Sequence, residues 1–272
     1  MKLKILLSLL LGALIITTIF IVKQPSTTIT LGEYEAKSQI DVTLDSLKIS
    51  IESSPDDQIH VQMYGSKLNK DSVKITEEAN KLLITENELL GNFQLRSTPT
   101  IILQLPKAQI KSLSLNTMDG DCTIQDLTLD TVEVKTVASF LQLNNISTSN
   151  ANLLTQDGAV KMNKSTINNL SITTSAGEVT LRESRGSDFA IQTTDGQIKI
   201  IEVVEQPNLH ITSEAGDIYI QYKLAPSSLQ LITAGEDIEI TLPKYDKKTS
   251  TIGDGVNMLS AETKYGFVVI KK

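Results

Sequence analysis

Apolar residues return at a fixed interval through residues 113–270, where a unit of 19 to 20 residues occurs eight times. Each unit holds two short segments in which apolar and polar residues alternate. The first segments begin at Leu113, Val132, Ala151, Leu170, Phe189, Leu209, Leu229 and Leu259. Nine residues further on, the second segments begin at Cys122, Leu141, Val160, Val179, Ile198, Ile218, Ile238 and Val268. Alternation with a period of two predicts β-strands that bury one face.

A fixed period of this length is typical of stacked repeat architectures. The unit is too short for two strands and a crossover helix, because a crossover alone needs at least about ten residues. We therefore predict an all-β fold, a parallel β-solenoid of eight coils in which the strands of each coil pair with those of the next. An aligned β-sandwich is the alternative, although its strands need no constant spacing.

Three polar columns accompany the apolar ones. A Thr or Ser lies four residues after the start of each first segment, and its hydroxyl is expected to bond to its neighbours in the column or to the backbone. These residues are Thr117, Thr136, Thr155, Thr174, Thr193, Ser213, Thr233 and Thr263. A glycine corner, where positive φ is expected, lies at Gly120, Gly158, Gly177, Gly196, Gly216 and Gly266. A second corner, whose residue types tolerate left-handed backbone, carries Asn150, Asn169, Asp188 and Asn208. All three columns are interpreted as scaffold.

Residues 1–23 combine two N-terminal lysines with an uncharged run, Ile5–Val22, that Lys23 closes. A helix of this length is about 27 Å long, enough to cross a hydrocarbon core. The end of the run, Phe20–Val22, lacks the small residues of a cleavage site. We predict one transmembrane signal anchor over residues 1–23, with the N-terminus in the cytoplasm and the rest of the chain outside. A cleaved secretion signal is the alternative, because the run is at the short limit for a span.

The remaining chain divides into three parts. Residues 24–30 read as a polar linker, residues 31–109 as an N-terminal β-rich cap, and residues 110–272 as the solenoid repeat domain. The open backbone of a first coil needs a cover, which is the expected role of the cap. Between the seventh and eighth copies Lys247–Val256 is inserted, and we expect a surface loop there.

Strands in the cap are indicated by alternating apolar residues without a steady period. The strand segments are Leu47–Ile51, Ile59–Met63 and Ile101–Leu105, with a hairpin that sets Val73 and Ile75 against Leu82 and Ile84. The cap is therefore expected to be an irregular opening of the rod.

The net charge limits the expected binding partners, and the single cysteine is predicted to be structural. The net charge of −7 argues against nucleic acid. No basic cluster is visible in the sequence that would concentrate the protein on anionic lipids or teichoic-acid polymers. The single cysteine, Cys122, occupies an inward strand position and is predicted to be a buried apolar residue.

The segment Thr117–Ile124, TMDGDCTI, is echoed by Thr174–Leu181 and Thr193–Ile200. These motifs resemble the bacterial putative-adhesin domain, a β-strand-repeat domain of unknown function found in LiaG-like envelope proteins. The resemblance covers most of residues 31–272. It implies an envelope β-solenoid, and its motifs contain no catalytic residues.

Acidic side chains gather at the glycine corner, at Asp119, Asp121, Asp157, Glu178, Asp195, Glu214, Asp217, Glu236 and Asp237. Stacked carboxylates of this kind can hold calcium. The nonapeptide pattern of calcium-binding β-rolls is absent from the sequence, however, and Asp157 and Asp195 would lie about 10 Å apart. Solvated turn acids are the preferred interpretation.

Carbohydrate-active solenoids need convergent carboxylates with basic residues in a cleft. The outward positions carry Lys161 and Lys199 two coils apart, and Arg182 and Arg185 near Glu183, without a persistent acid pair. His60 and His210 are isolated from any second ligand at zinc spacing. We therefore expect no enzyme, and we predict no catalytic, cofactor-binding or metal-ligating residue.

The expected function is a non-enzymatic binding or adhesion scaffold on the cell membrane, a single-pass protein with its C-terminal domain outside. Its expected partners are the membrane, through the N-terminal helix, and an envelope polymer or a membrane protein. An accessory regulator of a membrane-embedded envelope-stress signalling system is the alternative, and a polysaccharide lyase or hydrolase is third. A polar flank favours glycan contact, whereas a contiguous exposed apolar strip favours a protein partner. The outward aromatics Phe140, Tyr219 and Phe267 are too scattered for a sugar-stacking platform.

Overall fold

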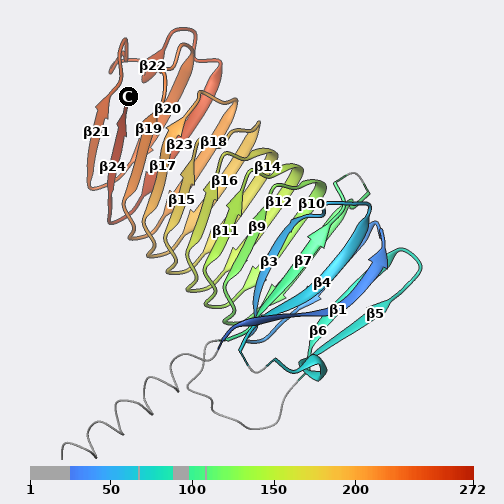
Figure 1. The fold of residues 1–272 in the computed structure, drawn as a ribbon. Coiled ribbons are helices and arrows are strands. Elements are labelled where there is room, and N and C mark those ends of the chain that lie inside the picture. The colour runs from blue at the N-terminus through green and yellow to red at the C-terminus, as the bar shows by residue number, and fades with distance from the viewer. Residues whose placement is uncertain (1–24, 67, 88–97, 108) are drawn as a thin grey trace, which may run out of the picture.

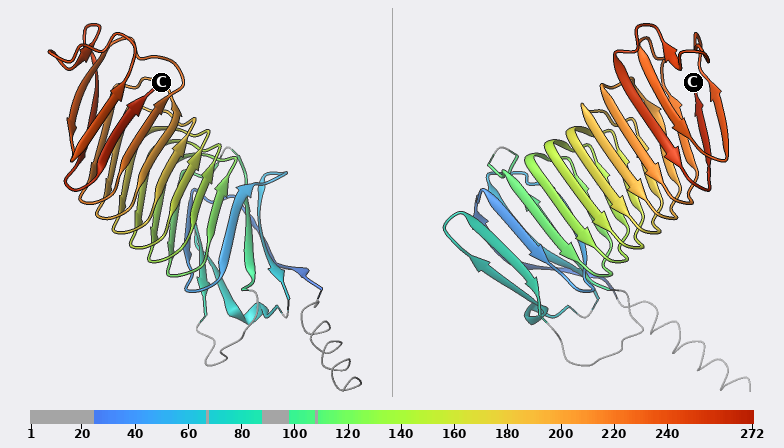
Figure 2. Two further views of the ribbon diagram at one scale, coloured as in Figure 1. Left: turned by 90° about the vertical axis from the view of Figure 1, so that its left-hand side faces the viewer. Right: turned by 180° about the vertical axis from the view of Figure 1, so that it is seen from behind.

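The computed structural model describes residues 25–66, 68–87, 98–107 and 109–272. Over these residues the chain is all-β, apart from one short 3-10 turn, Lys70–Ser72. Its strands form two sheets of twelve, which face each other along a rod (Figures 1 and 2). Most neighbouring strands are parallel. At about 4.8 Å per step, twelve strands span about 53 Å.

Sheet A contains, in spatial order, β1 (Thr27–Glu35), β4 (Gln58–Gly65), β7 (Thr100–Leu105), β3 (Lys48–Ser53), β9 (Cys122–Gln125), β11 (Leu141–Asn144), β13 (Val160–Asn163), β15 (Val179–Arg182), β17 (Ile198–Val203), β19 (Ile218–Tyr222), β24 (Phe267–Lys271) and β21 (Asp237–Thr241). Sheet B contains β22 (Thr251–Ile252), β20 (Leu229–Ala234), β23 (Asn257–Thr263), β18 (Asn208–Ser213), β16 (Asp188–Thr193), β14 (Thr166–Thr174), β12 (Ser147–Thr155), β10 (Thr128–Thr136), β8 (Ser112–Thr117), β2 (Gln39–Thr43), β6 (Lys81–Glu86) and β5 (Val73–Glu77).

The repeat places equivalent residues side by side, as a β-solenoid requires. Val132 pairs with Leu113 on one side and Ala151 on the other, and Leu141 pairs likewise with Cys122 and Val160. Each coil therefore takes one strand from each sheet. The predicted register is confirmed through the first six copies, from β8 to β19.

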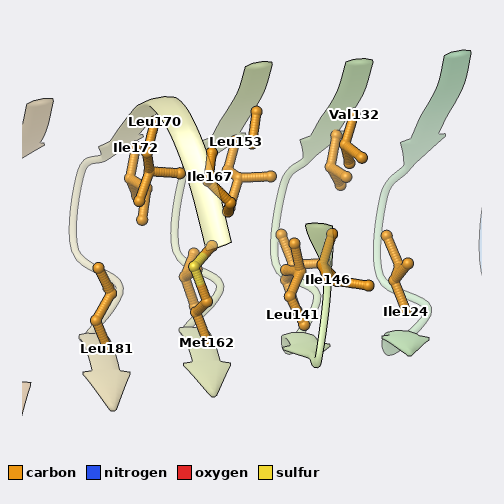
Figure 3. Packing of buried hydrophobic residues seen from close by; sticks show 14 of the residues in the cluster. Ile124, Val132, Leu141, Ile146, Leu153, Met162, Ile167, Leu170, Ile172 and Leu181 are labelled. Atoms are coloured by element: carbon orange, nitrogen blue, oxygen red, sulfur yellow. The ribbon is translucent and has the colours of Figure 1, made fainter. Parts of the chain in front are cut away.

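The core lies between the sheets and consists of the inward apolar columns. Figure 3 shows Ile124, Leu141 and Met162 of sheet A pointing toward Val132 and Leu153 of sheet B. These side chains are at most 1% exposed. A coil has too few apolar residues to bury its own face, so each column is closed by the coils above and below.

The glycine corner does not have the positive φ that the sequence led us to expect. The column from Gly120 to Gly266 lies outside the left-handed region, and close packing of the coils explains its composition instead. A Cβ on Gly177 would lie 2.0 Å from the carbonyl oxygen of Gly158, and one on Gly196 would lie 2.1 Å from that of Gly177. Glycine is needed because successive backbones nearly touch.

Left-handed backbone occurs at a different corner, which follows the strands of sheet A. This left-handed corner consists of Asp126, Asn145, Lys164, Glu183 and Glu202, with φ between 49° and 56°. Such a conformation costs about 1–3 kcal/mol for a non-glycine residue and persists where neighbouring structure enforces it. The expectation of left-handed backbone in the asparagine column was wrong. Those residues lie on strands of sheet B, where Asn169 Nδ2 donates to Asn150 Oδ1 at 3.0 Å.

The hydroxyl column bonds to backbone rather than to itself. Thr174 Oγ1 accepts from the Gly177 N–H at 3.0 Å and donates to the Gln156 carbonyl of the preceding coil at 3.3 Å. The same pair of bonds recurs at Thr155 and Thr193. At these three positions the hydroxyl closes its own corner and ties it to the preceding coil, whereas the buried Thr117 hydroxyl of the first copy has no partner among the described residues.

The repeat copies stack in sequence order only from the first to the sixth. The eighth copy, β23 and β24, pairs directly with the sixth, and the seventh copy, β20 and β21, lies outside the eighth. The expected pairing of each unit with the next is therefore wrong at this end. In sheet B the seventh copy is also shifted by two residues, since Leu231 rather than Leu229 faces Leu259.

The inserted segment makes this reversal possible. The chain leaves β21 and returns along β22, which pairs antiparallel with β20 and buries Ile252. Leu242 and Tyr245 pack against the same core cluster. The segment Lys247–Val256 is therefore mostly exposed, as expected, but it also helps to close the distal end of the core.

The N-terminal end repeats this arrangement. The coil of β2 and β3 lies between the coil of β6 and β7 and the first repeat coil of β8 and β9. The region expected to be an irregular cap therefore contributes two regular coils as well as the antiparallel strands β1, β4 and β5. The predicted hairpin is confirmed as β5 and β6, with Ile75 opposite Ile84.

A carboxylate holds the second coil from each end. Glu86 accepts hydrogen bonds from the backbone N–H groups of residues 45–47, in the turn between β2 and β3. Glu205 accepts from residues 227–228 and from Asn257 Nδ2, at 2.7–3.0 Å, where the eighth copy enters the stack. Burial raises the pKa of the Glu205 carboxyl, but the hydrogen bonds together lower it by more, so that the pKa lies below its ordinary value of 4.5.

The predicted anchor, residues 1–23, lies outside the described residues. Within the described ranges, no helix is long and apolar enough to cross a membrane.

Substituting one inward and one outward residue of β14 tests the register. Ile172→Asp buries a carboxylate between Leu153 and Ile191 without a partner, and we expect it to lower the free energy of unfolding by more than about 4 kcal/mol. Ser171→Asp, one residue away but exposed, should change it by less than about 0.5 kcal/mol. Thermal melting followed by circular dichroism measures both, and equal shifts would contradict the register.

Acid should loosen the distal end through Glu205. Its pKa is lower in the folded protein than in the unfolded chain, so its stabilisation is fully present above about pH 4.5 and is lost as the pH falls through the folded-state value. Glu205→Gln should lower the melting temperature at about pH 7, and the gap to the unsubstituted chain should narrow at about pH 3. A gap that stays constant between these pH values would exclude this role.

Candidate binding surfaces

The outer side of sheet B carries an extended polar surface over β12, β14, β16 and β18. We call it the amide face and define it by the outward residues Asn150, Asn152, Leu154, Asn169, Ser171, Thr173, Asp188, Ala190, Gln192, Asn208, His210 and Thr212. It lies on four neighbouring strands in register and extends about 14 Å along the rod. Most of these side chains are exposed.

The amide face carries little charge, because Asp188 is its one carboxylate and Lys and Arg do not occur in it. On the neighbouring strand β10, Glu133 and Lys135 neutralise each other at 2.7 Å. Leu154 is the one large apolar side chain of the face, 43% exposed. The surface therefore offers amide and hydroxyl donors and acceptors without a strong field or an apolar strip.

A hollow of about 300 Å³ lies at the left-handed corner, over coils three to six. Its lining includes Lys164, Thr166, Glu183, Arg185, Glu202 and Lys223. These residues come from successive coils and occupy equivalent or adjacent corner positions.

The hollow coincides with a break in the repeat. β17 has a β-bulge between Ile200 and Val203, after which Val203 pairs with Tyr222. Two residues separate Ile200 from Val203, but only one separates their partners Ile220 and Tyr222 in the sixth coil. The sixth coil therefore lacks the extra corner residue, and Glu202 is the last member of the left-handed corner. A bulge redirects the chain locally. The corner column ends where Lys223 begins to line the hollow.

The charges of the hollow are unequally paired. Arg182, beside the hollow, bonds to Glu202 at 3.1 Å, and Lys223 lies 3.6 Å from Glu183. Lys164 forms no ion pair with any residue in the described ranges. Arg185 has Thr166 Oγ1 as its side-chain partner there, at 3.4 Å from Nε. Two cations thus remain uncompensated around one depression.

The acidic residues of the glycine corner are spread along the edge and partly engaged. Asp121 pairs with Lys48 at 2.7 Å, Glu178 with Lys199 at 3.4 Å, and Asp217 accepts from the Phe267 N–H at 2.9 Å. Among the described residues, no group of three or more His, Cys, Asp or Glu side chains is placed to hold a metal ion.

Cys122 is 1% exposed, as expected. Burial, and then the neighbouring Asp121 carboxylate, raise the pKa of its thiol to about 12. His60 lies on β4, opposite Glu33 of β1, with Nε2 2.8 Å from Asp56 Oδ1. The hydrogen bond from the Gln58 N–H, followed by that from His60, lowers the pKa of Asp56. His210 is exposed on the amide face.

The outward aromatic residues do not form one platform. Phe140 belongs to the second coil, whereas Tyr219 and Phe267 belong to the adjacent sixth and eighth copies. Lys271 Nζ lies 4.9 Å from the centre of the Tyr219 ring. Lys161 and Lys199 stand two strands apart on sheet A, on either side of Thr180.

The sequence interpretation missed the hollow. Arg182, Arg185 and Glu183 were interpreted as outward residues without a persistent acid pair, and no basic cluster was identified. The signal was nevertheless present, since Lys164, Glu183 and Glu202 follow one another at 19 residues, as do Thr166, Arg185 and Val204. This spacing of charged residues in the corner columns indicates that they lie side by side, just as the spacing of apolar residues indicates the core columns.

Solved bacterial structures share this fold. One from Parabacteroides distasonis ATCC 8503, described as a putative lipid binding protein, has a TM-score of 0.58 at 13% identity, covering 91% of this chain and 96% of that one. A putative adhesin from Parabacteroides merdae ATCC 43184 has a TM-score of 0.55 at 12% identity, covering 91% and 95%. A putative adhesin from Bacteroides fragilis NCTC 9343 has a TM-score of 0.50 at 14% identity, covering 92% and 97%.

At these identities the likeness shows the fold alone. No curated protein sequence matches the chain. The family model described as Toastrack DUF4097 matches residues 37–269, which include both sheets almost completely. The chain therefore belongs to the Toastrack DUF4097 family.

Proposed function

We propose that the protein is a non-enzymatic binding scaffold of the cell envelope, which displays the amide face to a neutral, hydroxyl-rich polymer. The observation that carries the proposal is the composition of this face, amides and hydroxyls on four equally spaced strands with one carboxylate. The described adhesin structures with the same fold agree with a scaffold role.

Glycans suit such a surface for two reasons. Their hydroxyl groups both donate and accept, as asparagine, glutamine and threonine side chains do. A charge-poor surface also avoids the cost of removing ions from water when a neutral chain covers it. Individual contacts of this kind are weak, but several rods in one membrane would add them through avidity.

The scaffold is proposed to stand on the outer side of the cell membrane, held by residues 1–23. The charge pattern of this segment supports the proposal, with Lys2 and Lys4 before the apolar run. β1 begins at Thr27, so the N-terminal end of the rod would be the end nearest the membrane.

A regulatory contact with a membrane protein is the second candidate function. It is favoured by exposed apolar side chains at the distal end, where Tyr265 is 55%, Phe267 50% and Ile238 39% exposed. Ile238 lies on β21, the last strand of sheet A in the described residues. A protein partner would be expected at this end rather than on the amide face.

Charging the amide face should weaken polymer binding. The full chain in detergent is mixed with insoluble chitin and, separately, with cell-wall sacculi, and the retained fraction is measured. Asn152→Asp combined with Ser171→Asp should lower retention about tenfold, because two desolvated carboxylates would face a neutral polymer. Gln142→Asp combined with Thr180→Asp, at outward positions of sheet A, is the matched control and should bind normally.

Equal retention of all three proteins would contradict a role for the amide face. Release of soluble fragments from either polymer, lost on substituting one carboxylate such as Glu183→Gln, would overturn the scaffold proposal in favour of a lyase or hydrolase.

The anchor has its own test. The full-length protein should remain in the membrane fraction after alkaline carbonate washing, and external protease should digest the domain in intact cells. A soluble mature chain that begins near Gln24 would show instead that residues 1–23 are a cleaved signal.

A further inference from the structure

The hollow at the left-handed corner contains unpaired positive charge on a chain whose net charge is −7. Its lining has three cations, Lys164, Arg185 and Lys223, and two carboxylates, Glu183 and Glu202. Arg182 at its border already neutralises Glu202. The local balance is therefore positive, opposite to that of the whole protein.

We propose that this hollow is an anion-binding site that takes one oxyanion, a phosphate or a carboxylate, carried on a linear envelope polymer. Lys164 and Arg185 supply the charge, and Thr166, which contacts Arg185, supplies a hydroxyl. The site is separate from the amide face and lies on a corner of the rod rather than on a sheet.

Arg185 gives the site its directional donors. Its Nε already contacts Thr166 Oγ1 at 3.4 Å, which orients the guanidinium, and its terminal nitrogens have no protein partner among the described residues. A guanidinium with free terminal N–H groups matches the two oxygens of a carboxylate or phosphate. Thr166 and Arg185 are also cross-strand neighbours through a parallel β-bridge, so their backbones are fixed relative to each other.

Lys164 adds a point charge from a fixed position. It lies in the left-handed corner with φ 49°, and its N–H donates to the Arg182 carbonyl of the next coil at 3.0 Å. The backbone at the hollow is therefore held by the coil stack before any ligand arrives, so ligand binding orders side chains only.

A polymer is a better fit than a lipid headgroup. β13, which immediately precedes Lys164, is the seventh strand of sheet A from β1, about 29 Å along the rod. On a rod that stands on residues 1–23, the lipids around the anchor would not reach this height. A polymer that runs through the cell wall would pass the hollow at this height. The hollow is small enough to hold one anionic group, and a polymer that repeats this group along its length would present it many times.

The test uses the full chain in detergent and immobilised polymers of known charge. The probes are poly(glycerol phosphate) for phosphate, polygalacturonate for carboxylate and dextran as the neutral reference. We expect binding to one or both anionic polymers that weakens with added salt. Lys164→Asn combined with Arg185→Gln should reduce it about tenfold. Asparagine keeps the left-handed backbone, as Asn145 does in the same column.

The matched control removes two exposed positive charges outside the hollow, with Lys111→Gln and Lys161→Asn. Neither residue forms an ion pair with the described residues, so the change in net charge is the same. This variant should bind like the unsubstituted chain. Equal losses of polymer binding in the two double variants would show that binding depends only on net charge, and would overturn the proposed site. Absence of binding to both anionic polymers would also overturn it.

One further outcome is decisive. Binding to phosphatidylglycerol vesicles but to neither anionic polymer would contradict the polymer assignment. Because Lys164 and Arg185 lie outside the amide face, failure of this site leaves chitin retention unchanged. Failure of the amide-face proposal would appear only in the Asn152 and Ser171 variant.

Discussion

The whole structure depends on parallel, in-register hydrogen bonding between coils of nearly equal length. A single coil cannot bury its apolar side chains, so each becomes stable only when the next coil repeats its path. This constraint explains the composition of the columns. Where successive backbones approach closely, a Cβ on Gly177 would lie 2.0 Å from Gly158, and only glycine fits without a shift. Where a corner must be tied to its neighbour, a threonine hydroxyl bonds to both coils.

The same constraint makes the ends of the rod a problem, which both ends solve in the same way. An end coil exposes unpaired backbone and an open core. At the N-terminal end the coil of β2 and β3 lies one place inward and is covered by the coil of β6 and β7. At the distal end the coil of β23 and β24 lies one place inward and is covered by the coil of β20 and β21. Glu86 accepts hydrogen bonds from the turn of the inserted coil at one end. Glu205 at the other end accepts from Asn257 of the inserted β23 and from residues 227–228, which lead into the covering strand β20. The long, uniform flank between the ends is what remains available for binding, with the amide face on one side and the charged hollow on a corner.

Periodicity in the sequence was enough to predict the inward columns, the two strands of each coil and the hairpin of β5 and β6. It could not predict stacking order, because the seventh and eighth copies carry the same apolar pattern and either could pair with the sixth. Composition also misled the assignment of backbone conformation, since glycine serves close approach here, while Lys164 and Glu183 hold the left-handed corner. The hollow was missed for a related reason. Its residues are far apart in sequence, and only the corner register, with the bulge in β17, brings Lys164, Arg185 and Lys223 to one place.

The order of coils at the distal end is the most direct test of this account, because the closed core, the Glu205 contact and the rod itself depend on it. Thr212 and Glu262 are paired neighbours in β18 and β23, and parallel neighbours lie within the Cα separation that a disulfide bridges. The account predicts that Thr212→Cys with Glu262→Cys forms a disulfide under mild oxidation, whereas Thr212→Cys with Ile232→Cys does not. Efficient cross-linking of residues 212 and 232, without that of 212 and 262, would show that the copies stack in sequence order and would contradict the structure described.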